Sequence, residues 1–244
     1  LCAVRLEEPR HSAVVFRRPG YAKLGAREEH IHTRSAEMVV ETAHQLALGR
    51  PEYLVLDGGY LQIDGLSDRQ QEFDEVLDCG ECDDATTARA LQLATDSAAE
   101  AQLEILCRSL HRVAREVAPL QVCLLPPASP LGLLQPGRME LVLSELSNLN
   151  VGYWHSTSNA ALLSKLTGGS PQDWTARFGT KLRGVYLADT LGGHGEQPPG
   201  LGEIDFSKLA PELARATVRV LVMDEDSGTR LRFGTDHLAK VGIF

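Results

Sequence analysis

Residues 183–206 read RGVYLADTLGGHGEQPPGLGEIDF, and this stretch carries the main evidence for the fold. It opens with a short, almost continuously apolar run at 184–189, which is typical of a strand buried on both faces. A glycine-rich loop with two adjacent prolines follows the strand. The pattern at 205–216 then predicts a helix that leads into another strand. We therefore read this stretch as one strand–loop–helix unit of an α/β protein.

The same unit recurs along the chain. Besides 184–189, short apolar runs that predict strands lie at 2–6, 13–16, 53–59, 122–127, 151–155 and 218–224. Helical spacing of apolar residues predicts further helices at 34–49, 83–117 and 137–148. Because no change of composition or low-complexity linker separates these elements, we expect one α/β domain over residues 1–244.

Two α/β architectures fit seven parallel strands: an open doubly wound sheet, and a (β/α)8 TIM barrel whose first strand is missing or atypical. No G-x-G-x-x-G follows the early strands, which argues against a dinucleotide-binding sheet. Asp57, His155, Asp189 and Asp224 each end a different predicted strand. Barrel enzymes place their sites at these ends, so we favour the barrel.

Composition limits the function classes. The net charge of −9 argues against a nucleic-acid partner, and no apolar run is long enough to span a membrane. Five cysteines form an odd set that predicts reduced thiols and a cytoplasmic protein. The chain opens without Met and almost inside a strand, so we expect the start of a longer gene product to be absent.

Three stretches resemble the xylose isomerase-like TIM barrels, which include sugar phosphate isomerases and epimerases and relatives of AP endonucleases. PPGLGEIDF at 198–206 is similar to that family's P-P-G-x-G-x-I-D-F loop. VGYWHSTSNAALL at 151–163 is similar to its sixth strand, and PEYLVLDGGYL at 51–61 to its fourth. The resemblance runs from about 34 to 226 and leaves the N-terminal thirty residues atypical.

The resemblance implies a divalent metal held by a Glu, an Asp, a His and a second Glu, and this chain departs from that set. Leu125, Ser156, Asn159 and Tyr186 stand at or near the corresponding positions on strands five to seven, and the last strand offers only Asp224 or Glu225. Neutral groups are weak ligands for a hard divalent cation. We therefore predict no metal ligands and no cofactor.

Two functions follow. The first is a sugar phosphate isomerase/epimerase-like enzyme with a degenerate metal site, and the second is a non-catalytic relative that binds a carbohydrate-like ligand or a protein partner. We assign proton transfer to Asp57, His155, Asp189 and Asp224, and contacts with a small sugar-like ligand to Ser156, Asn159, Tyr186, Glu196 and Arg17. His155 has two possible placements, inward as a base or outward between the barrel and its helices. The sequence does not set the oligomeric state.

Overall fold

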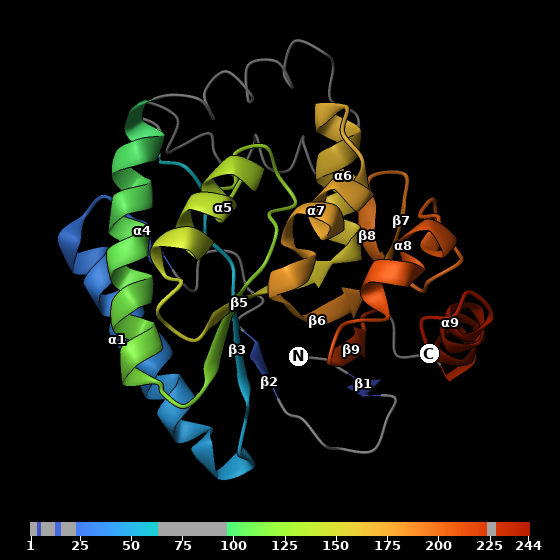
Figure 1. Cartoon of the computed structure of the whole chain (residues 1–244), viewed down its shortest axis with the longest axis horizontal. Helices are drawn as coiled ribbons and strands as arrows, with labels where there is room; N and C mark the ends of the chain where they lie inside the picture. Colours follow the sequence, from blue (N-terminus) through green and yellow to red (C-terminus); the bar gives the residue numbers. More distant parts are fainter. Residues whose placement is uncertain (1–3, 6–12, 16–22, 63–96, 224–227) are drawn as a thin grey trace.

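The computed structural model describes residues 4–5, 13–15, 23–62, 97–223 and 228–244 (Figure 1). The strands are β1 (Val4–Arg5), β2 (Ala13–Val15), β3 (Tyr53–Leu56), β4 (Gln121–Leu124), β5 (Val151–Ser156), β6 (Leu182–Leu187), β7 (Asp189–Leu191), β8 (His194–Gln197) and β9 (Val218–Leu221). The α-helices are α1 (Glu29–Gln45), α4 (Ser97–Glu116), α5 (Pro136–Glu145), α6 (Thr157–Thr167), α7 (Pro171–Phe178), α8 (Phe206–Leu213) and α9 (Gly228–Lys240). Two short 3-10 turns, η1 (Ala47–Gly49) and η2 (Gly179–Lys181), precede β3 and β6.

One sheet organises the chain, with strand order β1-β9-β6-β5-β4-β3-β2. In this sheet, β2, β3, β4, β5, β6 and β9 are parallel, and their spatial order follows the chain, as in a barrel built of βα units. β1 pairs with β9 in the antiparallel direction, so the first strand is atypical. Within the described ranges no pairing joins β1 to β2, and the sheet is a curled partial barrel rather than a closed ring.

All seven predicted strands of this sheet contain strand residues, although parts of the N-terminal two and of the last one lie outside the described residues. The expectation that all of them are parallel is wrong for β1. The small antiparallel hairpin of β7 and β8 was not predicted. The helix predicted at 83–117 is present as α4 from Ser97, and residues 83–96 lie outside the described part of the chain.

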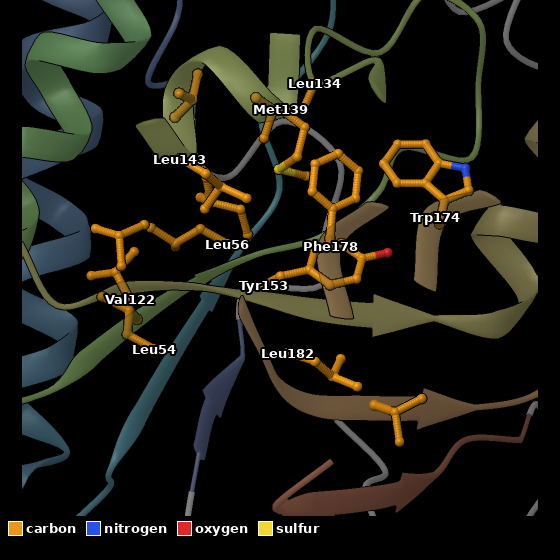
Figure 2. Close-up of a cluster of buried hydrophobic side chains, with 14 of the residues drawn as sticks. Leu54, Leu56, Val122, Leu134, Met139, Leu143, Tyr153, Trp174, Phe178 and Leu182 are labelled. Atoms are coloured by element: carbon orange, nitrogen blue, oxygen red, sulfur yellow. The ribbon is translucent and has the colours of Figure 1, made fainter. Parts of the chain in front are cut away.

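The parallel strands are buried on both faces, which explains why their sequences are almost continuously apolar. Their outward side chains, such as Leu54, Val122 and Tyr153, pack against the helices in a large core (Figure 2). Their inward side chains, including Trp154 and Tyr186, form a second cluster inside the curled sheet.

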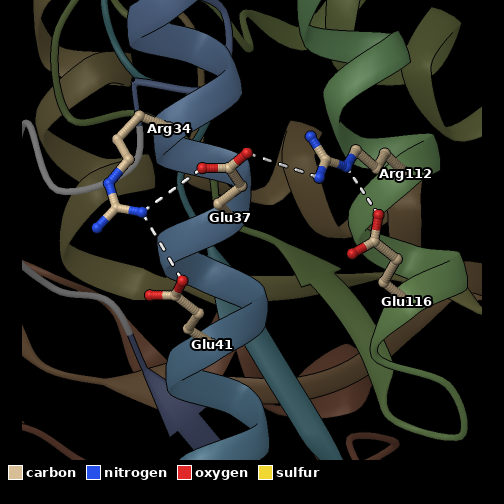
Figure 3. Close-up of polar contacts among 5 residues, drawn as sticks. All are labelled: Arg34, Glu37, Glu41, Arg112 and Glu116. Atoms are coloured by element: carbon tan, nitrogen blue, oxygen red, sulfur yellow. Dashed lines mark hydrogen bonds and ion pairs between the residues drawn. The ribbon is translucent and has the colours of Figure 1, made fainter.

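Helices α1 and α4 lie side by side against one flank of the sheet (Figure 1). Their contact faces bury apolar residues such as Val39 on α1 and Leu106 and Leu110 on α4. At the exposed edge, Arg112 lies 2.7 Å from the Glu116 carboxylate and 4.0 Å from that of Glu37 (Figure 3). Exposed ion pairs contribute at most about 1 kcal/mol each, so apolar burial is what holds the two helices together.

Candidate functional site

A cavity of about 230 Å³ lies where the carboxyl ends of β3, β4, β5, β6 and β9 converge. We call it the mouth pocket. Its apolar floor includes Leu125 and Val222, which belong to the inner cluster of the sheet. Its polar lining consists of two carboxyl groups, four hydroxyls and one amide: Asp57, Glu196, Tyr60, Ser156, Ser158, Tyr186 and Asn159. This position, at the carboxyl ends of barrel strands, is where barrel enzymes bind their substrates.

The structure separates the predicted site residues into three groups. Those that line the mouth pocket are Asp57, Ser156, Asn159, Tyr186 and Glu196. His155 and Asp189 are fully buried elsewhere and do not line the pocket. Arg17 and Asp224 lie outside the described residues.

Asp57 is the carboxyl group that lies directly at a strand end in the mouth pocket. It follows β3, and its Oδ1 accepts a hydrogen bond of 2.9 Å from the backbone N–H of Gly59. Burial nevertheless raises the pKa of Asp57 to about 6, because the hydrogen bond only partly offsets the loss of solvent. Gly58 is required beside it, since a Cβ there would lie 2.3 Å from Cγ of Leu134. A carboxyl group with a pKa near neutrality suits general acid–base catalysis.

The end of β5 and the start of α6 form the opposite wall. Ser156 caps α6, and its Oγ accepts a hydrogen bond of 3.4 Å from the backbone N–H of Asn159. The amide of Asn159 donates a hydrogen bond of 2.9 Å to the carbonyl of Pro126, which follows β4. The two neutral side chains thus fix the β5–α6 turn against the β4 loop, and both residues line the cavity.

His155 takes the outward of its two possible placements. Its neighbours in β5, Trp154 and Ser156, face the inner cluster and the pocket, so alternation turns the imidazole toward the helices. Nδ1 lies 2.7 Å from the hydroxyl of Tyr153. Burial lowers the pKa of His155 to about 3, so the ring is neutral at pH 7. This placement gives His155 no contact with the mouth pocket.

The depressed pKa of His155 predicts sensitivity to acid. The unfolded chain takes up a proton near pH 6.5, whereas the folded chain does so only near pH 3, so this contribution to stability is complete above pH 6.5 and is lost as the pH falls toward 3. We expect His155→Gln to lose less unfolding free energy than the wild type between pH 7 and pH 4.5. Urea denaturation at both pH values measures the difference. Parallel losses in the two proteins would contradict the assignment.

Asp189 is a structural anchor for the loop that follows β6. Its Oδ1 accepts hydrogen bonds from the backbone N–H groups of Thr190 (2.8 Å) and Ile204 (2.9 Å). Its Oδ2 accepts hydrogen bonds from those of Gly200 (2.9 Å) and Gly202 (3.0 Å). A Cβ on Gly202 would lie 2.2 Å from the carbonyl oxygen of Thr190, so the loop can close around the carboxylate only with glycine there. Each oxygen of the carboxylate therefore accepts two hydrogen bonds from the backbone of the loop.

Glu196 enters the pocket from the β7–β8 hairpin. Its backbone is left-handed, with φ of 66°, a conformation that non-glycine residues adopt rarely and that often marks functional positions. The next residue, Gln197, accepts a hydrogen bond of 2.8 Å from Arg230 of α9. Helix α9 therefore helps to fix the segment that carries Glu196.

Sequence reasoning did not select Tyr60 and Ser158, although both line the pocket. Their only signal is position, since each follows a predicted strand by a few residues. Tyr60 is held by an antiparallel bridge to Gly132, in the loop after β4.

The four residues at or near the family's ligand positions lie together: Leu125, Ser156, Asn159 and Tyr186 all line the mouth pocket. Within the described ranges, no three His, Cys, Asp or Glu side chains gather closely enough to hold a metal ion. These four positions offer one aliphatic, two hydroxyl and one amide group, which are weak ligands for a divalent cation. The anionic groups of the described lining are instead Asp57 and Glu196.

No family model and no curated protein sequence matches this chain. Solved structures do match, at low identity. A D-tagatose 3-epimerase-like protein has a TM-score of 0.65 at 12% identity, covering 95% of this chain and 76% of that one. The 3-keto-D-glucoside 4-epimerase from E. coli has a TM-score of 0.64 at 13% identity, covering 94% and 78%. A xylose isomerase domain protein from Planctomyces limnophilus has a TM-score of 0.60 at 11% identity, covering 94% and 75%. The chain therefore has the fold of the xylose isomerase-like TIM-barrel proteins, as the loop at 198–206 implied.

Proposed function

We propose that this protein is an isomerase- or epimerase-like enzyme that moves a proton between carbons of a sugar or sugar phosphate without the divalent metal of its structural relatives. The observation that carries the proposal is the presence of two carboxyl groups, Asp57 and Glu196, in one pocket at the carboxyl ends of the strands. The epimerases among the solved structures of this fold support the substrate class.

The chemistry needs only proton transfer. One carboxylate, which we assign to Asp57, takes a proton from the carbon next to the sugar carbonyl, and an enediolate forms. Return of the proton to the former carbonyl carbon, together with transfer of the adjacent hydroxyl proton to the old carbonyl oxygen, gives the isomer. Delivery of a proton to the opposite face of the same carbon by the carboxyl group of Glu196 gives the epimer. Hydroxyl groups of the pocket, such as those of Tyr60 and Ser156, would stabilise the oxyanion.

The lining also supports a second candidate, a non-catalytic sugar-binding protein. Ser156, Asn159 and Tyr186 replace the expected metal ligands with neutral hydrogen-bonding groups, which suit the hydroxyls of a carbohydrate as well as a transition state. The two candidates differ in whether a bound sugar exchanges its C–H protons with solvent.

We also propose that the protein is cytoplasmic. The free thiols of Cys107 and Cys123 are compatible with this location.

The first test follows exchange of sugar C–H protons for deuterium by NMR in D₂O, with pentoses, hexoses and their phosphates as substrates. We expect exchange that survives treatment with EDTA and that falls at least about 100-fold in Asp57→Asn, as is typical for loss of a general base. Exposed Asp236 provides the matched control, Asp236→Asn. Exchange that EDTA abolishes would contradict the metal-free mechanism. Sugar binding without exchange would favour the non-catalytic candidate.

Asp57→Asn should also make the fold more stable at neutral pH. The pKa of Asp57 is raised to about 6 from 3.8, so the charged carboxylate costs stability above pH 6, and the cost disappears below about pH 4. The asparagine Oδ1 can keep the hydrogen bond from Gly59. Because the side chain is partly exposed, we expect a gain of about 1–2 kcal/mol at pH 7.5 and none at pH 4. Urea denaturation at both pH values tests this, and a loss of stability at pH 7.5 would assign Asp57 a structural role instead.

A further inference from the structure

The charge of the mouth pocket distinguishes between cationic, neutral and anionic ligands of the size that fits the cavity. This inference rests on the proposed function, because it concerns the same pocket. Three properties of the described lining bear on it: the size of the cavity, its hydrogen-bonding groups and the sign of its charged groups.

The size selects a small ligand. Cavities that hold drug-sized molecules begin at about 300 Å³, and the mouth pocket, at about 230 Å³, is smaller. The wall combines hydrophobic groups such as Leu125 with hydroxyl and amide groups on several sides. A single polyhydroxylated ring fits this combination of size and polarity.

The charged groups of the described lining have one sign. Asp57 stands on the β3 side and Glu196 on the β8 side, and no Lys, Arg or His occurs among the described lining residues. Other titratable groups in that lining are the phenols of Tyr60 and Tyr186. The net charge of the chain, −9, adds to a negative field. An anionic phosphate group would be repelled by both carboxylates, whereas a cation would be attracted.

The backbone holds this arrangement in place. Glu196 has a left-handed backbone. Glycines 193 and 195 precede it, and Gln197, which accepts a hydrogen bond from Arg230, follows it. The side chain of Asp57 is oriented by the hydrogen bond that its Oδ1 accepts from the backbone N–H of Gly59. Asp57 and Glu196 thus bring two carboxyl groups from different elements to one small cavity, where both can accept hydrogen bonds from the N–H donors of an ammonium group.

We propose that the mouth pocket selects a cationic polyhydroxylated ligand, such as an amino sugar, over the neutral sugar of the same skeleton, and excludes the corresponding sugar phosphate. The amine would donate hydrogen bonds to the carboxylates of Asp57 and Glu196, and the ring hydroxyls would bond to the hydroxyl and amide groups of the wall.

The test compares charge at constant skeleton. Isothermal titration of the full chain at pH 7 uses glucose, galactose and mannose, their 2-amino-2-deoxy analogues and their 6-phosphates. We expect the amino sugar of at least one series to bind at least tenfold more tightly than its neutral parent, and the phosphate not to bind. Asp57→Asn and Glu196→Gln should each reduce this preference severalfold, whereas the exposed-site control Asp236→Asn should keep it.

The outcomes distinguish this inference from the proposed function. If a neutral sugar or a phosphate binds as tightly as the amine, the charge selection is overturned and sugar binding stands. If the amine preference persists in both carboxyl variants, the assignment to the mouth pocket is overturned. If no probe of any series binds, the selection is overturned, and the deuterium-exchange test with pentoses and hexoses decides the proposed function separately.

Discussion

Replacing Asp189 with alanine should lower the unfolding free energy by about 4 kcal/mol. The carboxylate is fully buried and accepts four hydrogen bonds from backbone N–H groups. Hydrogen bonds to a charged group contribute about 1.5–3 kcal/mol each, and a buried donor left without a partner costs about 1–3 kcal/mol. Relaxation of the loop toward water recovers part of this sum, which is why the expected loss is smaller than four full bonds.

Urea denaturation measures the loss of unfolding free energy. The variant Asp189→Asn tests how much of this loss comes from the carboxylate oxygens. The asparagine keeps one acceptor oxygen but turns an NH₂ group toward two backbone donors, so we expect an intermediate loss of about 2–3 kcal/mol. Asp236→Ala, the same change at an exposed site of α9, should alter stability by less than about 0.5 kcal/mol. An Asp189→Ala loss of similar size to this control would mean that the loop does not depend on the carboxylate.

The second large effect concerns the interior of the curled sheet. Trp154 is fully buried between the rings of Tyr53 and Tyr186, with ring centroids 5.6 Å and 5.3 Å away. Trp154→Ala should cost about 3–5 kcal/mol. Gly184, its partner on β6, has no room for a side chain, since a Cβ would lie 2.4 Å from the indole ring. Gly184→Ala should cost about 2–3 kcal/mol through overpacking.

The two substitutions should not add. Once the indole is removed, the methyl group of Gly184→Ala enters empty space, so the double variant should be about 2 kcal/mol more stable than the sum of the single changes predicts. Denaturation of all four proteins completes the cycle. Gly179→Ala, at a helical position where a Cβ meets nothing within 4 Å, should cost nothing and raise stability by about 0.4–1 kcal/mol. Simple additivity would refute the close contact between ring and glycine.

The strands of the sheet could be predicted because parallel strands bury both faces and so leave long apolar runs in the sequence. The same property hid the orientation of His155. When both faces of a strand are apolar, alternation carries no signal, and only the observed neighbours of the imidazole, such as Tyr153, show that it faces the helices.

The candidate site was predictable in position but not in detail. A predicted strand end marked Asp57, and the family resemblance marked Ser156 and Asn159; the structure brings all three together in one pocket. Asp189 carries the same mark, yet its four partners lie at 190–204 and depend on how the loop folds back, which no local pattern encodes. The β7–β8 hairpin was missed because its glycine-rich sequence lacks the alternation of an amphipathic strand.

The direction of β1 has a practical consequence for labelling. Because β1 runs antiparallel to β9, Val4 pairs with Leu221, which is followed by Val222 in the wall of the cavity. A fluorophore carried on β1 itself would therefore lie close to the cavity and would compete with small molecules for access. Helix α4 contributes no residue to the described lining, so a label at one of its exposed positions, such as Arg108, is the better design for binding assays.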